Sequence, residues 1–476
     1  LLKDGGKLGF VITQSVFKTA AGAGFRRFEL PEQNRQKRPL KVLHVDDMIE
    51  LQPFEAASNR TALLVLQKGQ PTYYPIPYTI WRKVESARYT YDSTLDEVRA
   101  ATQRFECHAE PVDPSDPTSQ WLTAHPAALN AIRKVLGKAC YKAHAGVCTW
   151  LNPVYWVQKT YTHPNGDVVV QNITEGAKVK VEQVSMTVEP DLLYPLLRGR
   201  DVKRWCAQPS AWIIVPQDPD RPSRAYPEAR LQVDYPKTYA YLKRFEKELR
   251  NRSGYKQILS KREKEFYGLM DIDHYTFAPW KVVWREQSSQ MTAAIVGSES
   301  GKLVIPDHKL MLVPCEDENE AYYLCALLNS SIVGAIVRAY AVSIQMNPHI
   351  LDHIRIPCYD PKDPVHRRLA ELSMQAHLLM GGDPSPGGVS VEQAKAAIQY
   401  IEQRRRKGLL NQQTASEIIS ALQAAQPGTA QLDAIEAEID QLAAQVWGLT
   451  AQELEAIRQS LSQEGAHGDS ESEVEA

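Results

Sequence analysis

The sequence has few of the residues that build a disulfide or metal scaffold. Its 476 residues include seven cysteines, which are scattered and form no Cys-x-x-Cys pair. Several of them, such as Cys325, stand inside apolar runs. Cysteines of this kind usually serve as small buried hydrophobic residues in a reducing compartment. The twelve histidines form no His-Glu-x-x-His pattern. The sequence therefore predicts no disulfide framework and no metal site, and it favours a cytoplasmic location.

Long hydrophobic runs are also missing. The most apolar stretch, residues 321–342, is interrupted by Asn329 and Arg338. A membrane span needs about 20 predominantly apolar residues, so this stretch predicts a packed pair of helices and no membrane partner. No basic segment followed by an apolar one marks a signal peptide at the N-terminus.

Charge is distributed unevenly, although the whole chain carries only −2. Residues 431–476 contain 11 acidic residues and one basic residue, a balance of −10 that leaves +8 on residues 1–430. A basic body with an acidic tail is compatible with a polyanionic partner.

The pattern of apolar residues divides the chain into several regions. Strands are predicted at 7–12, 41–45 and 61–67 and a short helix at 24–30, which together form the tail of an alternating α/β sheet that needs further parallel strands. Residues 71–110 are rich in Pro, Tyr and polar residues and are predicted to be a connector. Residues 111–380 alternate short strands with helices at 235–251 and 318–328, as expected of an α+β domain. The predicted remainder is a linker at 381–389, a helical region at 390–462 and an acidic, disordered tail at 463–476.

Residues 1–67 carry the first resemblance to a known family. A Gly5-Gly6 turn leads into the strand at 7–12, and Phe54 precedes Glu-Ala-Ala-Ser-Asn-Arg-Thr and the strand at 61–67. These segments resemble the last third of the catalytic domain of adenine-specific DNA methyltransferases, which have a Rossmann-like class I sheet. An enzyme that modifies a base inside DNA must extrude it and hold it, usually against an aromatic ring. The resemblance implies that Phe54 stacks on the flipped adenine; the alternative is that Phe54 only fills the edge of the sheet.

The same resemblance implies that part of the enzyme lies upstream. The sequence starts without Met, and no strand precedes residue 7 to pair with it. No Gly-x-Gly turn follows a strand in the right order to seat S-adenosylmethionine, and no Asn-Pro-Pro-Tyr loop precedes Gly5. We therefore expect a fragment whose cofactor, S-adenosylmethionine, is bound by a missing N-terminal portion, and which binds no cofactor itself.

A second motif lies at residues 196–205. Four cations stand within seven residues there: Arg198, Arg200, Lys203 and Arg204. This run resembles a hallmark of the TaqI-like specificity domain that follows such methyltransferase domains, and residues 146–152, 266–269, 275–285 and 327–331 resemble the same family. The alternative is a solvated turn.

The resemblance implies that this region binds double-stranded DNA. Arginine can read guanine edges or grip phosphates with two hydrogen bonds, whereas lysine acts as a point charge. Base reading is assigned to loop residues Arg200, Lys203, Arg285 and Gln287. Phosphate contacts are assigned to Lys261, Arg262 and Lys264.

Two further patterns suggest catalysis and are weighed against it. Asn152-Pro153-Val154-Tyr155 looks like the Asn-Pro-Pro-Tyr loop of these enzymes, but it lacks the second proline and follows the Phe54 strand instead of preceding Gly5. Asp191, followed by Asp201 and Lys203, fits the loose spacing of a magnesium nuclease, a pattern that is common by chance.

The sequence thus predicts part of a type IIG-like restriction-modification enzyme. The parent would transfer a methyl group from S-adenosylmethionine to the N6 amino group of adenine in DNA. This fragment would supply sequence recognition and the stacking ring, and it would be inactive alone. The alternatives are a stand-alone DNA-specificity subunit and, with less support, a magnesium-dependent nuclease.

Overall fold

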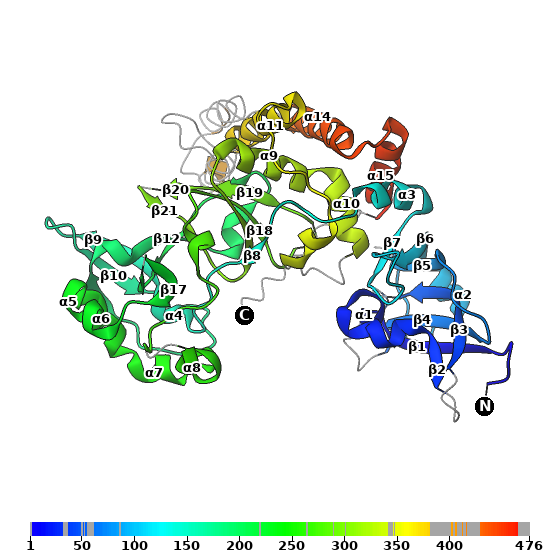
Figure 1. Ribbon diagram of the computed structural model, residues 1–476, viewed down its shortest axis with the longest axis horizontal. Coiled ribbons are helices and arrows are strands. Elements are labelled where there is room, and N and C mark those ends of the chain that lie inside the picture. Colours follow the sequence, from blue (N-terminus) through cyan, green and yellow to red (C-terminus); the bar gives the residue numbers. More distant parts are fainter. Residues whose placement is uncertain are drawn as a thin grey trace.

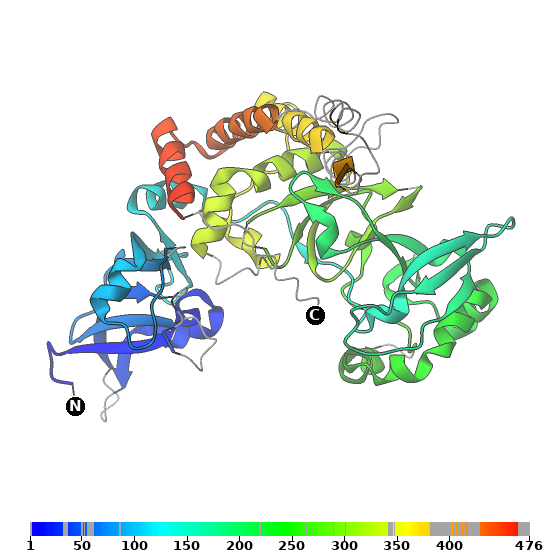
Figure 2. The same cartoon turned by 180° about the vertical axis from the view of Figure 1, so that it is seen from behind.

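A computed structural model gives the fold of the chain (Figure 1). It describes residues 2–31, 37–48, 51, 53–54, 61–84, 87–218, 220–262, 265–288, 290–299, 301–340, 346, 348–380, 401–402, 405–406, 412, 416 and 429–464. Viewed from both sides, these residues form an arch (Figures 1 and 2). An N-terminal sheet stands at one end, a second sheet with helices α5–α8 stands at the other, and a region of helices and a small sheet lies between them.

The N-terminal unit is one mixed sheet. Its described strands are β1 (Lys7–Thr13), β2 (Glu29–Pro31), β3 (Lys37–Asp47), β4 (Thr61–Lys68), β5 (Ile76–Lys83), β6 (Thr102–Pro111) and β7 (Trp121–Ala124). They are ordered β1-β4-β3-β5-β6-β7, and β2 pairs with β3. Because β4 is antiparallel to both β1 and β3, the latter two strands run parallel. The predicted strands at 7–12, 41–45 and 61–67 are confirmed within these elements.

A compact aromatic core holds this sheet together. Phe17, from the short helix α1 (Ser15–Lys18), stacks on Trp121 of β7 with ring centroids 4.6 Å apart. Both rings are fully buried. Lys18 is buried as well, and its Nζ donates to Thr123 Oγ1 at 2.9 Å and to the Ala339 carbonyl at 2.6 Å. That amine therefore ties the sheet to the central part of the arch.

Two predictions for this region were wrong. Residues 71–110 are not a connector: β5, α2 (Leu95–Ala100) and β6 occupy most of this stretch, and the two strands extend the sheet. The predicted helix at 24–30 is replaced by a 3₁₀ helix, Ala20–Arg27, followed by β2. β5 and β6 mix buried and exposed positions and contain charged residues such as Arg82 and Arg104, so these strands lack the continuous apolar run that marks a strand covered on both faces.

Beyond the N-terminal unit the chain forms a six-stranded sheet. Its order is β11-β10-β9-β15-β12-β22. The strands are β9 (Trp156–Thr162), β10 (Val168–Asn172), β11 (Ser185–Val188), β12 (Leu193–Leu197), β15 (Ala211–Ile214) and β22 (Ile305–Pro306). The surrounding elements are α4 (Asn152–Tyr155), β16 (Gln217–Asp218), β17 (Arg221–Ala225), α5 (Glu228–Asp234), α6 (Pro236–Arg244), α7 (Glu246–Asn251) and α8 (Ser260–Arg262). Tyr241, Leu242 and Phe245 cover the apolar face of this sheet. We name the six-stranded sheet, together with α4–α8, β16, β17 and the loops between them, the distal unit.

The central part of the arch combines a small sheet with helices. The sheet has the order β19-β18-β23-β8, formed by β8 (His144–Ala145), β18 (Trp280–Arg285), β19 (Ala293–Val296) and β23 (Leu310–Cys315). Two short hairpins adjoin it, β13 (Val202–Lys203) with β14 (Cys206–Ala207) and β20 (Ser298–Glu299) with β21 (Lys302–Leu303). The helices are α3 (Pro126–Val135), α9 (Glu318–Asn329), α10 (Ser331–Tyr340), α11 (Pro364–Met380), α14 (Thr429–Trp447) and α15 (Ala451–Glu464).

Helix boundaries in this part follow from capping chemistry. The Asp317 side chain accepts a hydrogen bond from the Glu320 amide at 3.0 Å, which caps α9. Gly448 adopts φ +67° and ends α14, and Thr450 caps α15 by accepting from the Glu453 amide at 3.2 Å. The helical region predicted at 390–462 is therefore broken between Gly448 and Thr450. Most of the linker and helices predicted between 381 and 428, and the tail from 465, lie outside the described residues.

The cysteine prediction needs one correction. Cys140 and Cys358 form a disulfide, with their Cα atoms 5.3 Å apart. The two residues are 218 positions apart in sequence, which is why their pairing left no local signal. The other five cysteines are free thiols, and four of those are buried, as predicted.

Among the described residues no single helix is long and apolar enough to cross a membrane. Only α9 and α10 taken together reach that length and apolarity, and they are bent by 58° at their junction.

Candidate nucleic-acid interface

Phe54 lies at the sheet edge where β1 and β3 end. It follows β3 in the turn before β4, and 49% of its surface is exposed. The segment before Phe54 is anchored to the rest of the unit, because the Tyr89 hydroxyl donates to the Leu51 carbonyl at 2.9 Å and Leu51 is buried. Residues 55–60, which complete the predicted motif, lie outside the described part. The ring is therefore accessible to a ligand, and it is not a buried plug.

A buried polar network lies beside this turn. Gln14 Nε2 donates to Asp47 Oδ2 at 3.1 Å, and the Tyr78 hydroxyl donates to the same oxygen at 2.5 Å. Burial and the neighbouring carboxylate raise the pKa of Tyr78 well above its ordinary value. All three side chains are at least nine-tenths buried. The network fixes the carboxyl ends of β1 and β3, from which the Phe54 turn departs.

Four cations from distant segments converge beyond the end of β12. Arg200 precedes β13, Lys203 is its last residue, and Arg285 ends β18. Arg285 Nε donates to the Val202 carbonyl at 2.8 Å, so the two segments lie side by side. Lys309 joins them because its Cβ lies 3.5 Å from where a Cβ on Gly199 would stand. We name Arg200, Lys203, Arg285 and Lys309 the cationic cluster.

Lys309 is a member of this cluster that the sequence analysis missed. It follows Asp307, whose Oδ1 accepts the Lys309 amide at 2.9 Å and closes a tight turn. The Asp307 amide in turn donates to the Leu197 carbonyl at 2.9 Å. Asp307 is buried, and burial raises the pKa of its carboxyl to about 7. The Asp-x-Lys spacing in the sequence could have indicated the turn that presents Lys309. Only the fold shows that this turn lies beside the end of β12.

Two of the residues predicted to contact DNA instead make hydrogen bonds and ion pairs within the chain. Arg198 is buried beside Asp201, with Nε 3.5 Å from its carboxylate, and it donates to Ser210 Oγ at 2.5 Å. Arg204 Nε donates to Glu436 of α14 at 2.6 Å, and its Nη2 donates to the Asn329 carbonyl at 2.5 Å. These contacts hold the motif in place, and they direct both guanidinium groups away from an external phosphate.

The other predicted contacts are dispersed. Gln287 is exposed just after β18, next to the cationic cluster. Lys261 is exposed in α8, on the far side of the distal unit. Arg262 is the last residue of α8, and Lys264 lies outside the described residues.

The two weighed catalytic patterns have structural roles. Asn152 accepts a hydrogen bond from Thr149 Oγ1 at 2.6 Å, and the Tyr155 hydroxyl is buried against the Tyr267 carbonyl at 2.7 Å. Asp191 and Asp201 stand at opposite ends of β12, about 16 Å apart for a five-residue strand. The part of the chain that the structure describes also contains no cluster of His, Cys, Asp or Glu suited to a metal.

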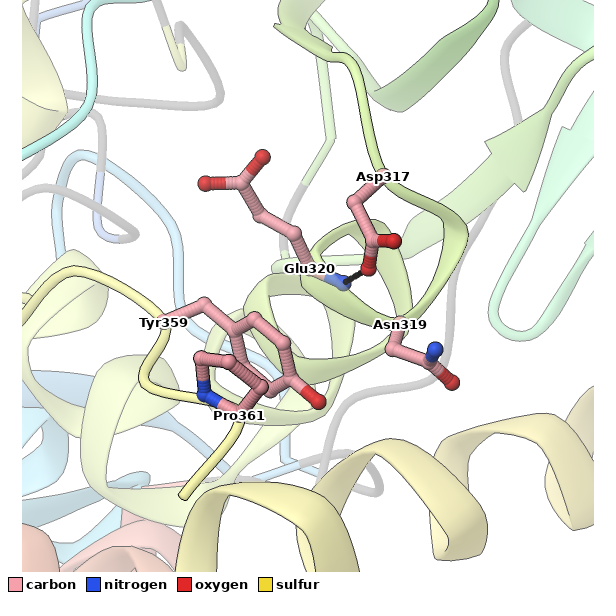
Figure 3. Close-up of a pocket in the computed structure, with 5 residues that line it drawn as sticks. All are labelled: Asp317, Asn319, Glu320, Tyr359 and Pro361. Atoms are coloured by element: carbon pink, nitrogen blue, oxygen red, sulfur yellow. Dashed lines mark hydrogen bonds between the residues drawn. The ribbon is translucent and has the colours of Figure 1, made fainter. Parts of the chain in front are cut away.

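A pocket of about 320 Å³ lies at the start of α9 (Figure 3). Asp317, Asn319, Glu320, Tyr359 and Pro361 line it. Figure 3 shows that the Asp317 carboxylate accepts a hydrogen bond from the Glu320 backbone amide. With two acids and no cation in its lining, this pocket does not suit a phosphate group.

Comparison with known proteins gives one weak sequence similarity and several loose similarities in fold. No protein-family model matches it. The type II methyltransferase M.NspV of Nostoc sp. is 27% identical over 146 residues, which is 30% of this chain and 29% of that protein. The chain is thus weakly similar in sequence to part of a type II methyltransferase, and the match covers under a third of that relative.

Three solved structures are loosely similar in fold. The type IIL restriction-modification enzyme MmeI in complex with DNA has a TM-score of 0.46 at 10% identity, covering 96% of this chain and 49% of MmeI. The type IIG restriction endonuclease BpuSI has a TM-score of 0.28 at 11% identity, covering 93% and 47%. The type ISP enzyme LlaGI, in complex with a DNA substrate mimic, has a TM-score of 0.36 at 11% identity, covering 79% and 30%.

Proposed function

We propose that this chain is the DNA-recognition and base-holding portion of an adenine-specific DNA methyltransferase of a restriction-modification system. In the whole enzyme a methyl group passes from S-adenosylmethionine to the N6 amino group of adenine. The missing N-terminal portion of the polypeptide binds the cofactor and supplies the Asn-Pro-Pro-Tyr loop. The observation that carries the proposal is the sequence similarity to a type II methyltransferase.

The exposed edge of the N-terminal sheet supports this division of labour. Leu8, Phe10 and Val11 of β1 are 43%, 41% and 49% exposed. Among the described strands, β1 pairs only with β4, so its outer edge offers backbone groups to another strand. An apolar, unpaired edge is a site for association. In our proposal the remaining catalytic strands pair there, and the chain has no methyltransferase activity alone.

The base-holding role rests on Phe54. Its exposed ring follows β3 in the chain, and Asp47, the last residue of β3, belongs to the Gln14–Asp47–Tyr78 network. Ligands of open α/β sheets bind beyond the carboxyl ends of the strands. In the proposal the flipped adenine stacks on this ring.

The recognition role rests on the cationic cluster. Cations from several segments that converge on one surface suit a phosphate backbone or the acceptor edges of guanine. We assign double-stranded DNA as the partner and Arg200, Lys203, Arg285 and Lys309 as its contacts, with Gln287 at the border.

The first alternative, a stand-alone specificity subunit, conflicts with the open apolar edge of β1, which such a subunit would leave exposed to aggregation. The nuclease alternative conflicts with the separation of Asp191 and Asp201 across β12.

The test has two arms. In the first, the isolated chain is titrated with duplex DNA at several salt concentrations, and affinity should fall with salt in proportion to the phosphates contacted. In the second, methyl transfer from labelled S-adenosylmethionine is measured for the chain alone and after co-expression with its upstream polypeptide. Binding that does not depend on salt, or transfer by the chain alone, would overturn the proposal.

A further inference from the structure

Trp150 combines exposure with an unusual backbone conformation. Its φ of +57° lies in the left-handed region, which a bulky residue rarely adopts. The side chain is nevertheless 46% exposed, in the loop that leads into α4 of the distal unit. Residues held in such conformations cluster at ligand-binding sites because the surrounding structure must maintain them. Burial of the ring therefore cannot account for keeping tryptophan here.

The ring is held rigidly from one side. It lies against Gly254, where a Cβ would stand 2.4 Å from Trp150 Cδ1, so only glycine leaves room for it. The indole Nε1 donates to Met270 Sδ at 3.2 Å. These two contacts fix one face and one edge of the indole.

The loop beneath the ring is equally fixed. The Leu151 amide donates to Thr149 Oγ1 at 3.1 Å. Arg252 is buried, and its guanidinium donates to the carbonyls of Thr149 at 2.6 Å, Phe266 at 2.9 Å and Gly268 at 2.5 Å. A buried arginine thus holds the backbone on both sides of the site.

The segment that supports the ring also carries positive charge. Gly254 opens a π-helical turn, Tyr255–Leu259, a conformation often found at functional sites. Lys256 is exposed on this turn, and its Cα lies within about 8 Å of the Gly254 Cα. Lys261 is exposed one turn further on. Glu248 is the nearest described acid before Lys256 and Glu265 the nearest after Lys261. Asp271 follows Met270, and burial raises the pKa of its carboxyl.

We propose that Trp150 is a stacking platform for a nucleobase that has left the DNA duplex, with Lys256 and Lys261 on the adjoining phosphates. A fixed, half-exposed indole with neighbouring cations has the chemistry of single-strand stacking sites. The inference rests on the proposed function, because it assumes that this chain binds DNA. It adds a second aromatic contact, on the opposite end of the arch from Phe54.

The test compares three variants of the full chain by fluorescence anisotropy, using a labelled 30-nucleotide single strand and the matching duplex. Trp150→Gly removes the ring and suits the positive φ, so the fold should be kept, as thermal unfolding will show. Stacking contributes about 1–3 kcal/mol per base, so single-strand affinity should fall about tenfold. Trp150→Phe should retain most of the affinity. Tyr73→Ala, at a 68% exposed aromatic in the N-terminal unit, is the control and should have no effect.

The outcomes separate the two proposals. If the wild-type chain shows no salt-dependent binding to either the single strand or the duplex, the proposed function and this inference both fail. If the wild type binds DNA and Trp150→Gly binds both the single strand and the duplex as tightly as the wild type does, only the stacking inference fails. If Trp150→Phe loses as much as Trp150→Gly, an exposed aromatic face is not what the site provides, and the inference also fails.

Discussion

The two ends of the arch differ in how their sheets are completed. In the N-terminal unit the outer strand β1 exposes Leu8, Phe10 and Val11 along an unpaired edge. In the distal unit the apolar face of the six-stranded sheet is covered by helices of the same chain, through residues such as Tyr241 and Phe245. The contrast fits our proposal, in which the N-terminal sheet is completed by further strands and the distal unit is complete in itself.

The strongest test of this contrast is reconstitution. Methyl transfer should be absent for the isolated chain and should appear when the upstream polypeptide is co-expressed. Phe10→Asp should prevent this recovery, because it places a charge on the surface that the added part would cover. Val233→Asp is the matched control, since Val233 is 78% exposed on α5 of the distal unit. If Phe10→Asp recovers as fully as Val233→Asp, the β1 edge is not the joining surface.

The next largest effect concerns the stability of the central part, where Asp307 lies beneath the cationic cluster. Its folded pKa of about 7 exceeds the ordinary value of 3.8. A carboxyl with a raised folded pKa contributes stability that is fully present below about pH 4 and is lost as the pH rises through 7. The loss should reach at most about 4 kcal/mol.

Urea unfolding at pH 5 and pH 8 checks this expectation. The asparagine of Asp307→Asn cannot ionise. The free energy of unfolding of this variant, relative to that of the wild type, should therefore be higher at pH 8 than at pH 5. Lys281, whose pKa burial lowers to about 7, acts in the opposite direction at higher pH and is common to both proteins. An unchanged difference between pH 5 and pH 8 would show that Asp307 is not buried as described.

The exposed ring of the N-terminal unit gives the third prediction. In the reconstituted enzyme, Phe54→Ala should lower kcat/KM for methyl transfer by about 10- to 100-fold, since base stacking contributes about 1–3 kcal/mol. Phe54→Tyr should restore most of the activity because it keeps the ring. The affinity of the cationic cluster for duplex DNA should change little. Full activity in Phe54→Ala would mean that the ring only closes the sheet edge.

Sequence reasoning succeeded where a local pattern decides the structure. The strand predicted at 61–67 is β4, and the helix predicted at 318–328 is α9, whose start the Asp317 side chain caps. It failed for β5 and β6, because charged residues such as Arg82 and Arg104 interrupt the apolar pattern by which a strand is recognised.

For the candidate site, sequence reasoning located the motif but not the roles within it. Arg200 and Arg204 look alike in the sequence, and only the fold shows that Arg204 meets Glu436, 232 residues further along. Lys309 and Trp150 were missed for the same reason, because their significance depends on Gly199 and Gly254 from distant segments.

The smallest expected effect separates these neighbouring cations. Lys203→Ala should leave the unfolding midpoint unchanged, since Lys203 is exposed. It should weaken DNA binding by about 1 kcal/mol and reduce the slope of log K against log salt by about 0.9, the value for one lost phosphate contact. Arg204→Ala should do the reverse, because it removes charged hydrogen bonds to Glu436 and to the Asn329 carbonyl. Its cost should be about 1.5 kcal/mol of folding stability, with no change in the salt slope. If Arg204→Ala instead lowers the slope and leaves stability intact, its guanidinium faces the DNA, and the cationic cluster must be extended to include it.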